Sequence, residues 1–174
     1  MSVFFYLHFA DEDGIAVAWA PDDHELDNRL ASGGWIDDWK PLKFQLDKGV
    51  VVDYLPNSFA YRLCSDRLRQ VLDGARGSVD TVQWLPAIVT DEQGKEHSYA
   101  ILHFPEVPNV LSMTKSVLTG PMIVKAFLDK RLVEGHRIFS FPQETVRVVI
   151  AGEVKANIES SHCTGMKFSR VPVA

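Results

Sequence analysis

Cysteine is scarce in this chain, which excludes several classes of protein. The only two cysteines, Cys64 and Cys163, stand 99 positions apart in the 174 residues. They cannot form the disulfide framework of a small secreted domain, and this favours a reducing compartment. The Cys-x-x-Cys pairs of structural zinc sites are absent as well, so no metal site is expected from the cysteines.

Long hydrophobic runs are also missing. No window approaches 18 consecutive apolar residues, so no membrane-spanning segment is predicted. The start of the chain, MSVFFYLHFADEDG, lacks the basic region and the uniform apolar stretch of a secretory signal. We therefore expect a cytoplasmic protein without a membrane partner.

Motifs that would announce a reaction or a cofactor are absent too. The chain has no Gly-x-Ser-x-Gly elbow and no Gly-rich phosphate loop. The stretch HELDN (24–28) lacks the second histidine of a zinc helix, and DEDG (11–14) lacks the further ligands of a calcium loop. The sequence thus predicts no catalytic residue, no metal and no cofactor.

What is present is the pattern of one globular α+β domain over residues 1–174. The hydrophobic fraction of 46% and the charged fraction of 24% are ordinary for such a domain. Short β-rich segments outnumber helical ones, and hairpin turns such as Thr90–Glu96 separate them, which predicts a mainly antiparallel sheet with a few short helices. Strands are expected at 3–9, 15–19, 42–46, 81–89, 97–104, 122–128, 137–141, 147–150 and 167–173. Helices are expected within 21–32 and at 66–73 and 153–159, with a long loop from Pro105 to Gly120.

The stretch DYLPNSFAYRLCSDRLRQVLDG (53–74) raises a question about chemistry. Cys64 and Ser65 stand where a strand meets a helix, which is also where some nucleophiles lie. Ser65 is a favourable helix cap, and Gly74 is a favourable helix end. Cys64 continues an apolar strand, so a buried core position is the preferred interpretation. Pro86, in the following strand, predicts an edge position or a bulge.

A weak internal repeat has an offset of 86 residues. The shared pattern is strand, short helix, strand and proline. It places Cys64 on Ile150, Ser65 on Ala151, Leu68 on Val154 and Leu72 on Ile158. The apolar counterpart of Cys64 again favours a core role, and a true duplication stays a hypothesis.

Charge is distributed unevenly along the chain. Residues 1–60 hold eleven Asp or Glu and four Lys or Arg, a balance of −7, whereas residues 61–174 have a balance of +2. Such an acidic surface repels nucleic acid and attracts a basic protein, although it also serves simply as a solvated surface. Two tryptophans stand among these acids, as an interface anchor or as residues packed under their loop. The predicted partner-binding residues are Asp22, Asp23, Glu25, Trp35, Asp37, Asp38 and Trp39.

Five segments in order carry a family resemblance. They are WKPLKFQLDKG, DYLPNSFAYRLCSDRLRQVLD, VQWLPAIVTDEQGKEHSYAILHF, HRIFSFP and VVIAGEVKANIESSHCTGMKFSRVP. Together they resemble the eleventh family of immunity proteins from bacterial polymorphic toxin systems, a former domain of unknown function typified by a myxobacterial protein. The resemblance runs from about Trp35 to Pro172, and residues 1–34 match only loosely.

The resemblance implies a cytoplasmic protein that binds a cognate toxin and neutralises it without catalysis. It brings no catalytic residues with it. Two other classes stay open: a small enzyme without a recognisable motif, using Cys163 and His162, and a regulatory binding domain outside toxin defence. The sequence is compatible with an oligomer of identical chains and does not name the toxin.

Overall fold

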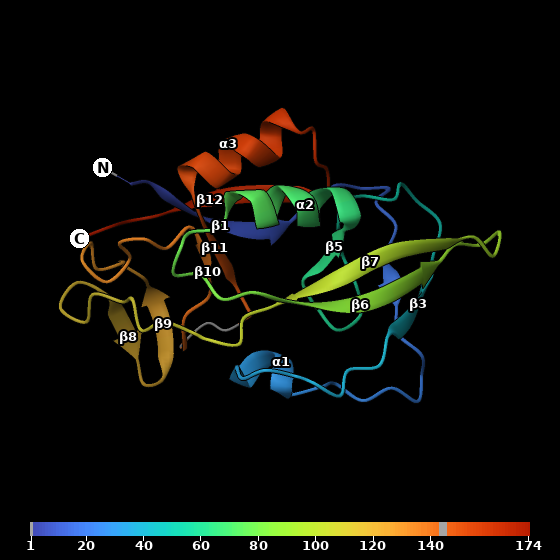
Figure 1. Ribbon diagram of the computed structural model, residues 1–174, viewed down its shortest axis with the longest axis horizontal. Helices are drawn as coiled ribbons and strands as arrows, with labels where there is room; N and C mark the ends of the chain where they lie inside the picture. Colours follow the sequence, from blue (N-terminus) through green and yellow to red (C-terminus); the bar gives the residue numbers. More distant parts are fainter. Residues whose placement is uncertain (1, 143–145) are drawn as a thin grey trace.

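The computed structural model describes residues 2–142 and 146–174, and these form an α+β fold (Figure 1). The strands are β1 (Phe4–Phe9), β2 (Ala18–Trp19), β3 (Leu42–Leu46), β4 (Tyr54–Leu55), β5 (Leu63–Ser65), β6 (Gln83–Thr90), β7 (Glu96–His103), β8 (Val117–Thr119), β9 (Met122–Lys125), β10 (Ile138–Phe139), β11 (Val148–Ala151) and β12 (Met166–Val171). The helices are α1 (Arg29–Ser32), α2 (Asp66–Ala75) and α3 (Gly152–Ser160). The predicted class, mainly antiparallel strands with a few short helices, is confirmed.

The smaller of the two main sheets is built around the N-terminal strand. Its order is β10-β11-β1-β12, and β1 is antiparallel to both of its neighbours. Buried side chains of β1 and β11 share one hydrophobic core with the buried residues of α2 and α3. The two helices lie side by side, with α3 above the strands and α2 overlapping β1 and β12 in the view of Figure 1. The predicted strand at 3–9 is confirmed, and its apolar character reflects an interior position in the sheet.

The larger sheet has the order β2-β3-β6-β7-β5-β4. In β3, Leu42, Phe44 and Leu46 are buried and the residues between them are exposed, which confirms the predicted alternation. The long hairpin β6–β7 closes through the turn at 91–95, where Asp91 N donates to Lys95 O. A second hydrophobic core lies over this sheet and includes the residues of β3 just named.

The expectation for Pro86 is wrong, because β6 is an interior strand with an unbroken register to β7. The parallel partner β3 begins to pair only at Ala87, opposite Leu42. The carbonyl of Pro86 accepts a hydrogen bond from Trp39 Nε1 at 2.9 Å. Since the nitrogen and the carbonyl of one residue point to the same strand edge, the missing donor lies where β3 has not yet begun.

The predicted repeat corresponds to two similar supersecondary units. The strands of β5–α2–β6 flank β7, and the strands of β11–α3–β12 flank β1, so each unit is a β-α-β split by an antiparallel strand. The helix starts obey the offset of 86, with Asp66 matching Gly152. The second strands begin at non-equivalent positions, so common origin stays a hypothesis.

Three local expectations are wrong. Only Arg29–Ser32 is helical within 21–32, because Leu26 is exposed and only Leu30 reaches the core. Helix α2 continues through Gly74 to Ala75, which is buried and extends the packed face. The expected loop from Pro105 to Gly120 contains β8, which pairs with β9 in a separate hairpin. Within the described residues, no helix is long and apolar enough to cross a membrane.

Candidate partner interface

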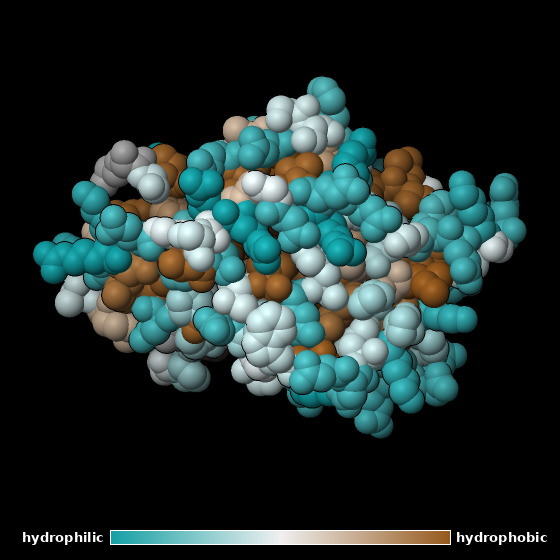
Figure 2. All heavy atoms as spheres, viewed as in Figure 1, coloured by the Kyte–Doolittle hydropathy of each residue, from teal (hydrophilic) through white to brown (hydrophobic). Residues whose placement is uncertain are grey.

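All seven predicted partner-binding residues lie on one segment, residues 21–40, which we call the acidic strap. The strap contains α1 and runs below the larger sheet in Figure 1. It contributes Leu30 and Ile36 to the second core, and Trp39 packs against that core. The five predicted acids are exposed, namely Asp22, Asp23, Glu25, Asp37 and Asp38. The strap runs along the lower right of the molecule in this view, and hydrophilic side chains dominate that edge in the space-filling picture (Figure 2).

The two tryptophans of the strap have different environments. Trp39 is half-buried, and its Nε1 donates to the Pro86 carbonyl, as expected for a residue packed under the loop. Trp35 is 59% exposed and precedes Ile36, which is only 3% exposed. The strap thus exposes the Trp35 indole to solvent, while the Trp39 indole holds the strap against the second core. The packed interpretation holds for Trp39, and the interface interpretation of Trp35 stays a prediction.

Trp35 is held by hydrogen bonds to the backbone on both sides of it. Ile36 N donates to Gln83 Oε1 at 3.1 Å, and Gln83 Nε2 donates to the Ile36 carbonyl at 2.8 Å. Gly34 N donates to the Pro105 carbonyl at 2.7 Å, and the Gly34 carbonyl lies 2.7 Å from His103 Nε2. Such fixed geometry lowers the entropy lost when an aromatic anchor enters an interface.

Two glycines give the strap its path before Trp35. Gly33 and Gly34 have φ angles of +76° and +84°, a region that side chains other than glycine rarely adopt. A Cβ at Gly33 would also lie 3.2 Å from the Pro105 carbonyl. The pair Gly33-Gly34 therefore ends α1 and turns the chain toward β6.

Arg29 joins the two halves of the strap. Its guanidinium donates to Asp27 Oδ2 at 2.7 Å and to Asp38 Oδ1 at 2.6 Å. The hydrogen bond from Arg29 holds the pKa of the Asp38 carboxyl below its usual value. Even with Arg29 and Lys40 counted, the six carboxylates of residues 21–40 leave a net charge of −4. The strap is therefore a surface of negative potential around an exposed indole.

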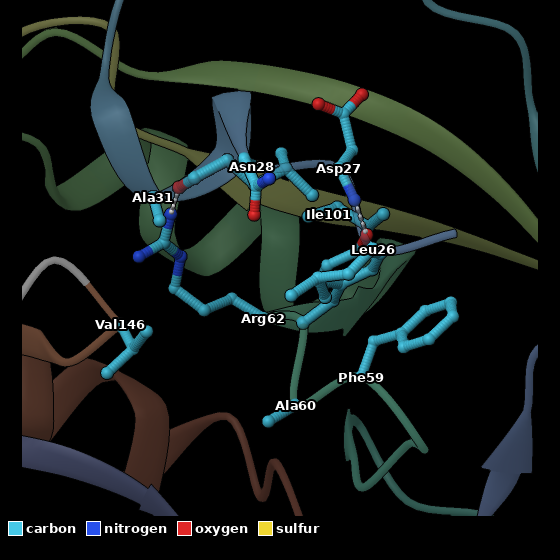
Figure 3. Close-up of a pocket in the computed structure, with 11 residues that line it drawn as sticks. Leu26, Asp27, Asn28, Ala31, Phe59, Ala60, Arg62, Ile101 and Val146 are labelled. Atoms are coloured by element: carbon cyan, nitrogen blue, oxygen red, sulfur yellow. Dashed lines mark hydrogen bonds between the residues drawn. The ribbon is translucent and has the colours of Figure 1, made fainter. Parts of the chain in front are cut away.

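A small pocket opens beside α1 (Figure 3), with a volume of about 100 Å³. Its walls are mostly apolar and come from the strap, the turn after β4, β7 and the segment before β11. They include Leu26, Leu30, Ala31, Phe59, Ile101 and Val146. Tyr61, also on the wall, fixes the strap here, because its hydroxyl accepts a hydrogen bond from Asp27 N at 2.8 Å.

Arg62 is the buried cation of this pocket, and its side chain reaches across it toward the backbone of α1 (Figure 3). Its Nε donates to the Leu102 carbonyl at 2.7 Å, and its NH2 group donates to the Leu30 carbonyl at 3.4 Å. The guanidinium also lies 5.0 Å from the centre of the Phe104 ring. Burial lowers the pKa of Arg62 from its usual value. The sequence analysis missed this residue, although an arginine inside the run FAYRLC was the available signal.

The strand-to-helix junction at Cys64 and Ser65 is structural. Ser65 Oγ accepts a hydrogen bond from Leu68 N at 3.2 Å, which confirms the helix cap, and donates to Asp53 Oδ1 at 2.6 Å. No histidine takes part in these contacts. Cys64 is fully buried, as predicted, and burial raises the pKa of its thiol far above the usual value. A thiol in this state is a poor nucleophile.

The geometry around the second cysteine, Cys163, also differs from that of a catalytic cysteine–histidine pair. Cys163 is half-buried against the first core, and its backbone N–H donates to the Ile158 carbonyl at 3.2 Å. Burial raises the pKa of the Cys163 thiol as well. Among the described residues, no hydrogen bond joins Cys163 to His162, which is exposed and has a φ of +53°. The geometry offers no activation of this thiol.

The sequence analysis missed one acid–histidine pair. Asp80 Oδ1 lies 2.9 Å from His136 Nδ1, and Asp80 Oδ2 accepts hydrogen bonds from the backbone N–H groups of Gly77, Arg137 and Ile138. Because Asp80 and His136 are 56 positions apart, no spacing pattern in the sequence reveals the pair. The contact with Gly77 closes the loop after α2, and the contacts with His136, Arg137 and Ile138 join that loop to the start of β10, which is a structural task. Across 2–142 and 146–174, no cluster of three or more His, Cys, Asp or Glu residues is placed to hold a metal ion.

No family model matches this chain, and no curated protein matches it. The strap presents an exposed indole among carboxylates on a hydrogen-bonded backbone, and aromatic and charged groups of this kind are common in protein interfaces.

Proposed function

We propose that this protein is a cytoplasmic immunity protein, which binds a cognate bacterial toxin and neutralises it without catalysing a reaction. The carrying observation is Trp35, an indole 59% exposed on a strap whose backbone is fixed on both sides of it. Tryptophan is among the residues that most often dominate binding energy. The resemblance of residues 35–172 to an immunity family supports the same conclusion.

The acidic surroundings supply the second part of the proposal. A partner with a basic surface would be attracted by the net charge of −4 on residues 21–40 and would then bury Trp35. Long-range attraction raises the association rate, while the buried aromatic group slows dissociation. Both properties suit a protein that must capture a toxin before the toxin acts on its own cell.

The experiment is a survival assay in bacteria. We expect a toxin-like reading frame beside the gene for this protein; its toxin domain is expressed alone or together with the protein, and growth is measured. Trp35→Ala should weaken toxin binding by a factor of about 30 or more, as expected for a central aromatic anchor, and should reduce protection. The matched control is Trp19→Ala, since Trp19 is 54% exposed but lies on β2, outside the strap.

Two results would contradict the proposal at different levels. Equal protection by the Trp35 and Trp19 variants would move the toxin-binding face away from the strap. Loss of growth despite the wild-type protein, together with no measurable binding to the toxin domain, would contradict the immunity function itself.

A further inference from the structure

We propose that the pocket beside α1 receives a branched aliphatic side chain, Leu, Ile or Val, from a basic segment of the partner protein. This inference rests on the proposed function, because it names the chemistry of the partner that the acidic strap would bind. It adds a second anchor point beside Trp35, formed by different residues. The occupant would carry Lys or Arg next to the aliphatic residue.

The first observation is the exposed apolar rim of the pocket. Leu26 is 53% exposed and Val146 is 67% exposed, and both line the pocket (Figure 3). On the face shown in Figure 2, hydrophobic surface occurs in separate patches between hydrophilic side chains. An apolar pocket with a polar surround is the usual setting for one buried anchor of a partner.

The size of the pocket selects the class of side chain. Its volume is about 100 Å³, whereas an engineered apolar cavity of about 150 Å³ accepts benzene. A pocket of this size suits a branched aliphatic group better than the ring system of Trp or Tyr. Phe59 and Ile101 supply apolar walls for it.

The charges around the pocket indicate which charge the partner should carry on the residues next to its aliphatic side chain. Asp27 lines the pocket and belongs to the strap, whose net charge is −4. Among the described residues that line the pocket, Arg62 carries the positive charge; its Nε and Nη2 donate to the carbonyls of Leu102 and Leu30, and the guanidinium lies against the Phe104 ring. These two N–H groups thus point into the protein, whereas the carboxylates of Asp22, Asp23 and Glu25 on the same strap are exposed to solvent. A cationic segment is therefore favoured over an acidic one.

The test uses two synthetic peptides with the full-length protein and needs no toxin. The probe is acetyl-Lys-Lys-Leu-Lys-Lys-amide, and acetyl-Glu-Glu-Leu-Glu-Glu-amide has the opposite charge. Nuclear magnetic resonance titration should show shifts of the Leu26, Ala31 and Ile101 amides with the lysine peptide only. Ala31→Phe places a ring at the pocket and should weaken this binding at least tenfold. Ser32→Phe is the control, since Ser32 is an exposed neighbour in α1 that does not line the pocket.

Leu26→Ser is a second variant, which removes part of the apolar wall at an exposed position and should also weaken binding. Thermal unfolding of each variant checks that it is folded. Stronger binding of the glutamate peptide, or an Ala31 variant that binds the lysine peptide as well as wild type, would overturn the inference. Protection from a toxin without any peptide effect would overturn the pocket inference alone. Peptide binding without protection would overturn the proposed function alone.

Discussion

Ile36 and Gln83 exchange a reciprocal pair of hydrogen bonds between the strap and β6. The Gln83 side-chain amide accepts from Ile36 N at 3.1 Å and donates to the Ile36 carbonyl at 2.8 Å. A side chain thus does for the strap what a neighbouring strand would do, since it satisfies both polar groups of a buried residue. The position of the adjacent Trp35 depends on this contact.

The first prediction concerns Gln83→Leu. Leucine has a similar size but leaves the N–H and C=O of buried Ile36 without partners, which should lower the free energy of unfolding by about 1–3 kcal/mol. Urea unfolding measures this change, and amide hydrogen exchange at Ile36 should become faster. Gln45→Leu is the control, because Gln45 is exposed and makes a single hydrogen bond of 3.3 Å. Equal destabilisation by both variants would show that the Ile36 contact has no special role.

The second prediction concerns acid stability through Asp53, which is only 6% exposed. Burial raises the pKa of Asp53, but hydrogen bonds from Arg67, Ser65 and Thr164 outweigh it, so the net pKa lies below the usual value. A carboxyl whose pKa is lower in the folded state stabilises the protein above its unfolded pKa of about 3.9, and this stabilisation is lost as pH falls through the folded value. Urea unfolding between pH 7 and pH 2 should therefore show decreasing stability below about pH 4.

The matched variant for this prediction is Asp53→Asn. It should be less stable than wild type at pH 7, because an amide cannot accept all the hydrogen bonds that reach both carboxylate oxygens. The difference from wild type should shrink toward pH 2, where Asp53 is protonated. A difference that stays constant across this range would mean that Asp53 does not contribute to the acid dependence.

The alternation of Leu42, Phe44 and Leu46 and the cap at Ser65 were predictable from sequence, because both are set by neighbours within a few residues. The short helix α1 was not, since Leu26 and Leu30 have helical spacing but only Leu30 meets the second core. Pro86 misled the prediction in the same way, because its tolerance depends on where β3 begins to pair.

Prediction of the candidate site from the sequence has the same limit, because contacts between distant positions are not visible in it. Acids and tryptophans of the strap lie close together in the sequence, and composition identified them. The pocket combines Leu26 with Ile101 and Val146, and the contact between Ile36 and Gln83 joins positions 47 apart. Such contacts are created by the order of the strands, which a single sequence does not specify.

The third prediction concerns the two thiols. Cys64 is fully buried and the pKa of its thiol is strongly raised by burial, so a thiol reagent at pH 8 should leave it unmodified in the native protein. We expect at most one reactive thiol per chain before denaturation and two after it, measured by the absorbance change that accompanies reaction of the reagent. The Cys163→Ser variant should then show none before denaturation. Rapid modification of that variant would mean that Cys64 is accessible.

Cys64→Ala should also lower the free energy of unfolding by about 1–2 kcal/mol, because it leaves a small cavity in the first core. The Cys163→Ser change, at a half-buried position, should cost less. A reversed order of these two effects in urea unfolding would contradict the core role of Cys64.

The fourth prediction separates the two members of the Asp80–His136 pair. Asp80 Oδ2 accepts three backbone hydrogen bonds, so Asp80→Ala should destabilise the protein by about 3 kcal/mol or more. His136→Ala removes one of the four partners and should cost clearly less. Both free energies come from urea unfolding. A larger effect of His136→Ala would show that the contact with His136 stabilises the protein more than the backbone hydrogen bonds to Asp80 do.

The last prediction tests steering by the strap. Association of the protein with the proposed toxin partner should slow markedly between about 50 and 500 mM salt, because the screening length falls to a few ångströms. Charge reversal by Asp37→Lys and Asp38→Lys should reduce the association rate and leave Tm nearly unchanged. Asp38 does pair with Arg29, but both side chains are well exposed, and such ion pairs add little stability.

The control has the same change in net charge at another place. Glu12→Lys and Asp13→Lys alter two exposed acids near the turn after β1, outside the strap. Stopped-flow tryptophan fluorescence would follow binding in the wild type and in both double variants. If the strap steers the toxin, its reversal slows association far more than the control does, since local potential decides the encounter. Equal rates for the two double variants, or rates insensitive to salt, would place the toxin-binding face elsewhere, with the hairpin turn 91–94 and the segment 105–120 as the next candidates.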